Sequence, residues 1–387
     1  MNDLSRRGFL TSTLGVACSA AAAPLLTPVR LAAAEGENRL VTIVLRGAMD
    51  AVGVFAPHDD PNFTAMRPFL KKGGKGGGYI DLDGRFGMDA RLGDLAPFWK
   101  RGELAIAHAV STPYRGKRSH FDGQDLLEAG VGQTKDVGDG WLNRALTRMG
   151  GAHLETAVSV GDIGMLLTQG DTPVRSWSPG AELSLQNDER QLLTRLYADD
   201  PLFAQAARMA TELSDLGGGE GGSNPTTQVA AYAADRLRAE ARIAAFSING
   251  WDTHANQRGA LNRPLKALSQ TLTTLRNGLG PAWDTTLVIA MTEFGRTVRE
   301  NGNKGTDHGT GGAAILAGGL LSKAAIFGDW PGIAPGNLYE DRDLMPTMDV
   351  RHYPAWALRA LYGLETSAIE NVIFPGLDMG PAQKFIA

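Results

Sequence analysis

The stretch Thr286–Gly312, TLVIAMTEFGRTVRENGNKGTDHGTGG, indicates how this chain folds and where its functional groups gather. An apolar run ends abruptly in a carboxylate, an aromatic ring and a guanidinium, and a loop rich in glycine and asparagine then delivers Asp307 and His308. Open α/β sheets build their sites in this way, at the carboxyl ends of buried strands. The stretch therefore predicts a buried strand over Leu287–Met291 that leads directly into a functional site.

Other apolar runs repeat this design along the chain. Leu40–Leu45, Leu104–Val110 and Ile243–Ile248 are apolar on both faces, as central parallel strands are, and a shorter run follows at Ala313–Ala317. Apolar residues between the runs have helical spacing, most clearly the leucines between positions 261 and 279. This alternation predicts a doubly wound, largely parallel α/β sheet with helices on both faces.

Composition narrows the class of protein. With 387 residues, of which 43% are hydrophobic, the chain has ample core, and it fits one large domain with insertions or one domain plus a cap. The formal net charge is −4 and no basic stripe stands out, which argues against a nucleic-acid surface. No run beyond the first residues reaches the roughly 18 to 20 apolar residues of a membrane span. The mature chain is therefore expected to have no membrane span.

The first residues are typical of an export signal. Ser5–Leu10 reads SRRGFL, a twin-arginine pattern, and Ala32–Ala34 suits a signal-peptidase cut. We therefore expect residues 1–34 to be a signal peptide read by the twin-arginine export machinery, and residues 35–387 to act in the periplasm or outside the cell. An ordinary secretory signal that contains two arginines is the alternative. Cys18, the only cysteine, lies inside this signal, so the mature chain has no thiol.

Residues 138–225 interrupt the alternation of strands and helices. Short apolar runs there precede a polar helical stretch at 188–216, which ends in a linker rich in glycine before Pro225. We expect this region to be an inserted cap or excursion from the main sheet.

Ionisable residues follow the ends of the predicted strands. Because the carboxyl ends of parallel strands share one edge, groups far apart in sequence are expected to converge there. Carboxylate and imidazole ligands suit Zn²⁺, Mn²⁺, Mg²⁺ or Ca²⁺, and one or two ions are expected. The candidate ligands are Asp50, Asp252, His254, Glu293, Asp307 and His308, and the candidate catalytic residues are Ser119, His120 and Arg296.

Several candidates have a second interpretation that is purely structural. Ser119 is either the N-cap of a helix or a nucleophile activated at that helix terminus. Glu293 and Arg296 form either a buried ion pair that locks their loop or, through Arg296, a clamp for an anion. Asp50 fits a turn as well as a metal site, and His120 is a general acid or a partner of another site residue.

The motifs also carry a family resemblance. In chain order they are LRGAMD (45–50), RSHFDGQD (118–125), WDTHANQ (251–257), TEFGRT (292–297), GTDHG (305–309) and FGDWPG (327–332). With the twin-arginine start, they resemble the DUF1501 family of exported bacterial proteins. That family is placed with the alkaline phosphatase/sulfatase superfamily. The resemblance implies two metal ions on a doubly wound sheet and a hydroxyl or thiol nucleophile at a helix N-terminus.

By position, the resemblance assigns roles to single residues. Asp50 matches the carboxylate ligand after the first strand, and Ser119 matches the nucleophile. Asp252 and His254 match the next ligand pair, although the superfamily usually spaces that pair further apart.

Two alignments compete for the remaining ligands. In one, Asp307 and His308 form the Asp-His pair of the superfamily. In the other, Glu293 and Phe294 occupy that place and His308 is the distal histidine. A phenyl ring cannot coordinate a metal, so the second alignment weakens one of the two metal sites.

The resemblance implies an exported metal-dependent hydrolase of phosphate or sulfate esters, acting on a small anionic ester. Ser119 would attack the ester and Arg296 would hold the anion. The alternative is a non-catalytic envelope binding or assembly protein that keeps the fold with a degenerate site and binds an envelope protein partner.

Overall fold

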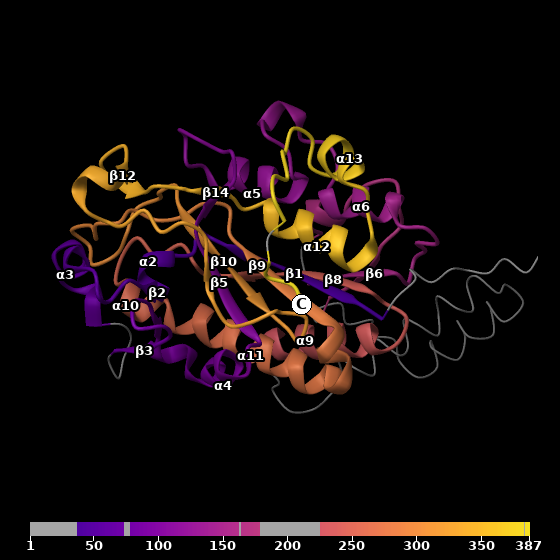
Figure 1. Ribbon diagram of the computed structural model, residues 1–387, viewed down its shortest axis with the longest axis horizontal. Coiled ribbons are helices and arrows are strands. Elements are labelled where there is room, and N and C mark those ends of the chain that lie inside the picture. The colour runs from indigo at the N-terminus through magenta and orange to yellow at the C-terminus, as the bar shows by residue number, and fades with distance from the viewer. Residues whose placement is uncertain (1–36, 73–77, 162–163, 179–224, 383) are drawn as a thin grey trace, which may run out of the picture.

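A mixed sheet forms the centre of the computed structural model, which describes residues 37–72, 78–161, 164–178, 225–382 and 384–387 (Figure 1). The expected signal peptide and residues 179–224 of the expected insertion lie outside the described residues. In spatial order the strands are β11 (Ile326–Phe327), β5 (Leu104–Ser111), β10 (Gly312–Ala317), β9 (Thr286–Met291), β1 (Arg39–Arg46), β8 (Ile243–Asn249), β6 (Ala157–Val160) and β7 (Arg175–Trp177), and β14 (Met348–Asp349) also pairs with β5.

Strand β1 is central and runs parallel to both neighbours, β8 and β9. Strand β10 is antiparallel to β9 and to β5, whereas the other pairs in this sheet are parallel. The start of β10 therefore lies at the edge where β1, β5, β8 and β9 end. The largely parallel sheet expected from the apolar runs is confirmed.

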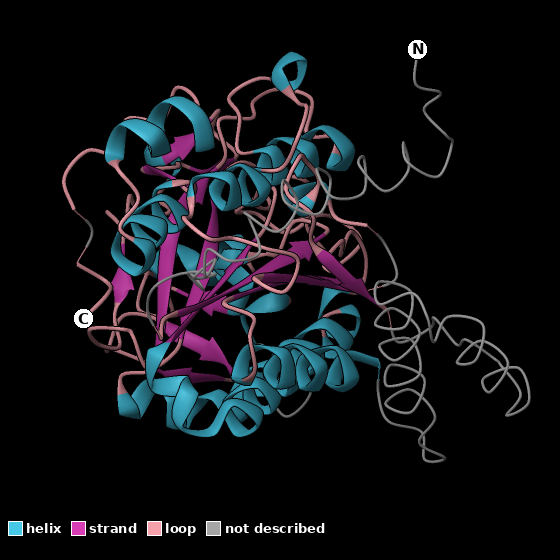
Figure 2. Cartoon of the chain, turned by 90° about the vertical axis from the view of Figure 1, so that its right-hand side faces the viewer, coloured by secondary structure: helices cyan, strands magenta, loops and turns pink. Residues whose placement is uncertain are grey.

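Helices cover both faces of the sheet, as Figures 1 and 2 show. One face carries α4 (Ala96–Arg101), α9 (Pro225–Arg238) and α11 (Asn262–Leu279), and the other carries α5 (His120–Ala129), α6 (Trp141–Arg148) and α12 (His352–Tyr362). Successive residues of β1 alternate between the two cores, because side chains along a strand point to opposite faces. The doubly wound arrangement is therefore confirmed.

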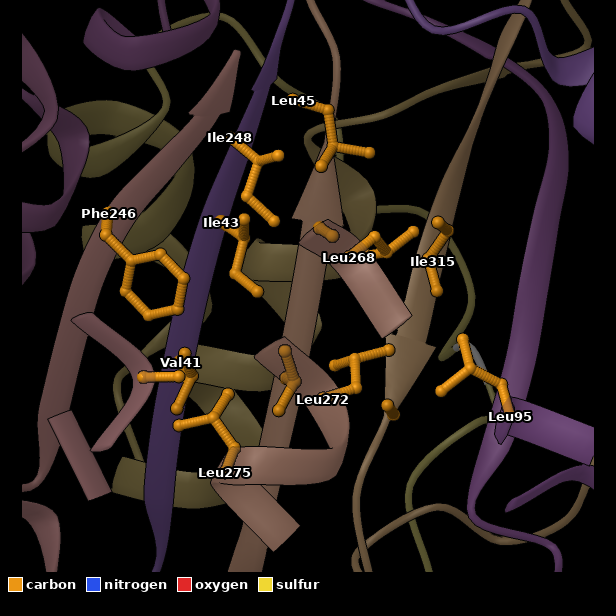
Figure 3. Packing of buried hydrophobic residues seen from close by; sticks show 14 of the residues in the cluster. Val41, Ile43, Leu45, Leu95, Phe246, Ile248, Leu268, Leu272, Leu275 and Ile315 are labelled. Atoms are coloured by element: carbon orange, nitrogen blue, oxygen red, sulfur yellow. The ribbon is translucent and has the colours of Figure 1, made fainter. Parts of the chain in front are cut away.

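The leucine spacing between positions 261 and 279 has its physical reason in the first core. Leu268, Leu272 and Leu275 of α11 lie on one side of the helix and pack on Ile43 of β1 and Phe246 of β8 (Figure 3). Steps of three and four residues place apolar side chains on one helix face, and that face is buried against the sheet.

The described part of residues 138–225 joins the main body. It contributes α6 to one face, and β6 and β7 to the edge of the sheet beyond β8. The expectation that the rest of this region is a cap stays a prediction.

Short elements complete the described chain. The helical ones are α2 (Ala51–Val54), α3 (Pro61–Met66), η1 (Leu70–Lys72), η2 (Ala90–Leu95), η3 (Thr134–Asp136), η4 (Leu166–Thr168), α10 (Gln257–Ala260), η5 (Gly280–Thr285), η6 (Pro335–Asn337), α13 (Thr366–Ala368) and η7 (Ile369–Ile373). The short strands are β2 (Phe55–Ala56), β3 (Tyr79–Asp81), β4 (Gly87–Asp89), β12 (Leu338–Tyr339) and β13 (Asp343–Leu344). Within the described residues, no helix combines the length and the apolar character that a bilayer crossing requires.

His108 on β5 is a buried titratable group inside this fold. Its ring packs against Phe86 and Trp330, its Nε2 lies 3.1 Å from the carbonyl oxygen of Phe55, and its Nδ1 accepts from the backbone of Ala109. Burial lowers the pKa of His108 from 6.5 to about 4.

The folded protein should therefore lose stability as pH falls. Between the unfolded pKa of His108, near 6.5, and its folded pKa, about 4, the unfolded state binds the proton and the folded state does not. The free energy of unfolding is expected to fall by about 3 kcal/mol across this window from His108 alone. Urea titrations at several pH values should show this slope, and His108→Phe should show a shallower slope. Equal slopes in the two proteins would contradict the prediction.

Candidate metal centre

The site lies at the edge of the sheet where β1, β5, β8 and β9 end and β10 begins. Helix α5, which follows β5, starts with His120, and the loop after β8 carries Asp252 and His254. Glu293 lies two residues after the end of β9, and His308 lies on the loop before β10. The backbone of His308 pairs with that of Arg296, and a Cβ on Gly309 would lie 2.5 Å from the carbonyl carbon of Arg296. Glycine at this position therefore allows the two loops to meet.

Asp252, His254 and His308 bring three ligand atoms into mutual contact. Nε2 of His254 lies 3.0 Å from Oδ1 of Asp252 and 2.8 Å from Nε2 of His308. Nε2 of His308 lies 3.3 Å from the same oxygen of Asp252. A fourth atom, Nε2 of His120, lies 3.4 Å from the other carboxylate oxygen of Asp252. His120, Asp252 and His308 each offer a ligand atom within 4.8 Å of the others.

The opposite nitrogen of each imidazole faces an oxygen. Nδ1 of His120 lies 2.8 Å from Oε1 of Glu293, and Nδ1 of His254 lies 3.3 Å from Oδ1 of Asp307. Nδ1 of His308 lies 2.8 Å from the carbonyl oxygen of Arg118. Since carbonyl and carboxylate oxygens only accept, these contacts suit the tautomer that carries hydrogen on Nδ1, whereas the carboxylate of Asp252 also offers an acceptor to each Nε2. The Nδ1 tautomer is the one that leaves Nε2 free for a metal ion.

In the Nδ1 tautomer, two lone pairs face each other and one nitrogen is unpaired. Nε2 of His254 and Nε2 of His308, 2.8 Å apart, then have no hydrogen between them. Nε2 of His120 is buried and makes no hydrogen bond to any described residue. A cation between these nitrogens and Asp252 would satisfy all of them.

The donor set fits a divalent metal ion. In a tetrahedral zinc site with bonds of about 2.0–2.1 Å, neighbouring ligand atoms are about 3.3 Å apart. The separations of 2.8, 3.0 and 3.3 Å among Asp252, His254 and His308 are close to that value. Imidazole nitrogens with one carboxylate are a set that zinc accepts.

Glu293 lies behind His120. Its Oε1 accepts from the backbone of Gly47 at 2.9 Å, from Nδ1 of His120 and from Nε2 of Gln124 at 3.1 Å, and its Oε2 accepts from the hydroxyl of Thr292. Burial alone would raise the pKa of Glu293, but these hydrogen bonds hold it below its usual value. The hydrogen bond to Glu293 in turn raises the pKa of His120.

Asp307 has the same relation to His254. Its Oδ1 accepts from the side chain of Asn301 at 3.0 Å as well as from His254. The bond from Asn301, followed by the one from His254, lowers the pKa of Asp307. Both Glu293 and Asp307, which the sequence offers as ligands, thus contact histidines of the cluster.

Arg296 is fully buried and holds the loops together. Its nitrogens donate to the carbonyl oxygens of Gly47, Ala48, Trp251 and Thr306, and to Oδ1 of Asp252. Although burial opposes it, this contact lowers the pKa of Asp252. Each guanidinium nitrogen of Arg296 therefore has a protein acceptor.

The structure does not bring Asp50 into this cluster. Both oxygens of its buried carboxylate accept from Arg67, at 2.6 and 2.9 Å, and Oδ2 also accepts from Gln257. Burial would raise the pKa of Asp50, but the charge of Arg67 outweighs it and the pKa is lowered. The charge of this carboxylate is therefore neutralised inside the protein.

Ser119 and Phe294 are neighbours of the histidines. Ser119 is the N-cap of α5, and its hydroxyl lies 3.5 Å from the backbone nitrogen of Asp122. The ring of Phe294 is stacked on His120 at a centroid distance of 5.2 Å and lies 5.3 Å from His308. Phe294 thus packs against the imidazoles, in the place where one of the two alignments would put a ligand.

Three supporting residues were missed in the sequence. Gln124, Gln257 and Arg118 lie in quoted motifs, yet no role follows from their residue types. The spacing of His120 and Gln124 is a usable signal, because residues four apart on a helix share a face and both contact Glu293.

The family can now be stated. A family model described as "Protein of unknown function (DUF1501)" matches residues 133–355, which is more than half of the chain. The chain belongs to the DUF1501 family. The resemblance seen in the motifs is thereby confirmed. A search among curated proteins gave no match for this DUF1501 chain.

Solved structures show weak similarity to the DUF1501 chain. The C-terminal periplasmic domain of EcEptC from Escherichia coli, in complex with Zn, shares 11% identity over 74% of each chain, with a TM-score of 0.34. The lipoteichoic acid synthase LtaP from Listeria monocytogenes shares 9% identity over 90% of this chain and 77% of its own, with a TM-score of 0.39. Similarity at this level carries no argument about activity.

Proposed function

We propose that this DUF1501 protein is an exported metal-dependent hydrolase of phosphate or sulfate esters. The convergence of three imidazole Nε2 atoms on Asp252, each with its Nδ1 facing an oxygen, carries the metal part of the proposal. The ester class rests on the resemblance of the motifs to the alkaline phosphatase/sulfatase superfamily.

His120, His254, His308 and Asp252 would hold one divalent ion, with zinc the best match to the donor set. A bound ion of this kind polarises an ester and stabilises a developing oxyanion. The pairing of Asp50 with Arg67 supports one ion rather than two.

The protein's own groups would position the reaction. Ser119 precedes His120 at the N-terminus of α5, where backbone N–H groups favour a negatively charged ligand. Its hydroxyl is the proposed nucleophile. Glu293 and Asp307 would keep His120 and His254 in the tautomer that leaves Nε2 free.

A second candidate is a non-catalytic envelope binding or assembly protein. It is favoured by two observations: Ser119 already serves as a helix cap, and Asp50 is neutralised by Arg67. In this candidate the ion would have a structural role.

The decisive experiment compares metal content and turnover in the folded protein. The hydrolase should contain about one zinc per chain and cleave aryl phosphates or sulfates. Ser119→Ala should lose turnover by several orders of magnitude and lose about 1 kcal/mol of stability with the cap. Ser119→Asn, which restores a capping side chain without a nucleophilic hydroxyl, should regain stability but not turnover.

Two other outcomes are informative. Bound zinc without turnover on a broad ester panel would favour the second candidate. Folded protein that contains no metal, and that none of the divalent ions stabilises against heat, would overturn both metal proposals.

Export is tested separately. A reporter fused behind residues 1–34 should leave the cytoplasm, and replacement of Arg6 and Arg7 by lysine should block its export. Export that persists in the lysine variant would instead indicate an ordinary secretory signal.

A further inference from the structure

The hairpin of β12 and β13 contains backbone that its residue types do not favour. Glu340 and Asp341, which follow β12, have φ angles of +52° and +54°. Glycine and asparagine are the usual residues in such tight hairpin turns. Residues other than glycine that are kept in a strained backbone conformation point to a role, provided that the contacts of their side chains supply one.

The side chains of this hairpin converge on Arg118. One guanidinium nitrogen of Arg118 donates to Oε2 of Glu340 at 2.8 Å and to Oδ2 of Asp343 at 3.0 Å. Asp343 is fully buried, and its Oδ2 also accepts from the hydroxyl of Thr310 at 2.9 Å. Arg118 itself has a φ of +52°. Its ion pairs therefore hold a second strained backbone position.

The backbone carbonyl oxygen of this residue, Arg118, accepts the hydrogen bond from Nδ1 of His308. Asp343 reaches His308 by a second route as well. Its Oδ1 lies 3.3 Å from one guanidinium nitrogen of Arg342, and another nitrogen of Arg342 donates to the backbone oxygen of His308 at 2.9 Å. Asp343 thus contacts both arginines that bond to His308: it accepts a hydrogen bond from Arg118 and lies at ion-pair distance from Arg342, although its Oδ1 has no hydrogen-bond partner among the described residues.

We infer that Asp343 is a positioning residue for the metal centre: through Arg118 and Arg342 it fixes His308 in the tautomer that carries hydrogen on Nδ1 and leaves Nε2 for the ion. The inference rests on the proposed function for its purpose, because the tautomer matters only if Nε2 binds a metal. Asp343 touches none of the four proposed ligand atoms directly in any described contact.

The test uses Asp343→Asn, with Asp341→Asn as its matched control. Both remove one charge from the same hairpin, but Asp341 is exposed and asparagine tolerates its backbone conformation. Nitrogen NMR of histidine-labelled, metal-free protein at a pH where the ring is neutral reports which nitrogen of His308 carries hydrogen. A His308→Gln variant assigns the signal.

In wild type and in Asp341→Asn, His308 should carry its hydrogen on Nδ1. In Asp343→Asn the signal should shift toward a mixture of tautomers. Zinc affinity, measured by competition with a chelating dye, should fall about 10- to 100-fold, as it does when a partner behind a ligand is removed.

Arg118→Ala is a second variant that tests the same inference if Asp343→Asn does not fold. It keeps the backbone carbonyl, removes the contacts to Glu340 and Asp343, and changes a partly exposed side chain. The same shift in tautomer and zinc affinity is expected. A wild-type tautomer and a zinc affinity within about twofold of wild type in the folded variants would overturn the inference.

Failure of the inference and failure of the proposed function are distinguishable. Wild-type protein that binds no zinc would remove the proposed function, yet the tautomer of His308 in metal-free protein would still test the role of Asp343. Conversely, the protein could bind zinc while the tautomer of His308 stays unchanged in the Asp343 and Arg118 variants. That result would overturn the inference but not the proposed function.

Discussion

Asp252→Asn is expected to lower zinc affinity by about a thousandfold, the largest effect of any single substitution in the cluster. Asp252 is the only anion among the four proposed ligands, and its two oxygens lie next to all three histidines. Structural zinc sites with four ligands bind with about 10–16 kcal/mol, or about 2.5–4 kcal/mol per ligand, and we expect the only anion among the ligands to contribute the upper value, about 4 kcal/mol. That value corresponds to about three orders of magnitude in the dissociation constant. Competition with a chelating dye measures it.

The matched control is Asp125→Asn, an exposed carboxylate on α5, which should keep zinc affinity within about twofold of wild type. The stabilisation of the folded state by added zinc, visible as a rise in melting temperature, should also disappear in Asp252→Asn and persist in the control. A variant that binds zinc as tightly as wild type would place the metal elsewhere.

Arg67→Met is expected to destabilise the protein by about 4 kcal/mol. The substitution leaves Asp50 buried with a charge and without the two hydrogen bonds that Arg67 supplies. Arg67 also donates to the backbone oxygens of Thr297 and Val298, so the loop after β9 loses support as well. Urea unfolding at neutral pH measures the loss.

Arg238→Met is the control for a surface ion pair. Arg238 lies at the end of α9, is more than half exposed and pairs with Asp235 at 3.3 Å, so its loss should cost within about 1 kcal/mol. Equal effects of the two substitutions would show that the Asp50–Arg67 pair is not the buried pair that the contacts indicate.

Variants of Asp50 test whether this residue stabilises the fold or binds a metal ion. The double variant Asp50→Leu with Arg67→Met should recover most of the stability lost in Arg67→Met, because neither charge then remains unpaired. Asp50→Asn should keep zinc affinity near that of wild type. A thousandfold loss of zinc affinity in Asp50→Asn would make Asp50 a ligand and contradict the single-ion proposal.

The positions of the strands could be predicted from the sequence because burial on both faces is a local property. The run Leu40–Leu45 became β1 (Arg39–Arg46), and Ile243–Ile248 became β8 (Ile243–Asn249). The edge that carries the site followed from the polar residues after these runs, since parallel strands end together. The direction of β10 could not be predicted, because a six-residue apolar run contains no signal of orientation.

Residue types alone determined that imidazoles and carboxylates gather at one edge of the sheet, and the motifs alone identified the family. Only the tertiary structure separates the groups that could bind a metal from the groups behind them. Glu293 and Asp307 have the same chemistry as Asp252, but they face Nδ1 of His120 and His254, whereas Asp252 faces the Nε2 atoms.

The role of Asp50, too, could not be predicted from the sequence. Nothing in its own motif indicates that Arg67, 17 positions along the chain, would neutralise it. The roles of these carboxylates depend on which partner lies within about 3 Å. That distance is set by how the segments around the site pack in three dimensions, and the spacing of residues along the chain does not contain it.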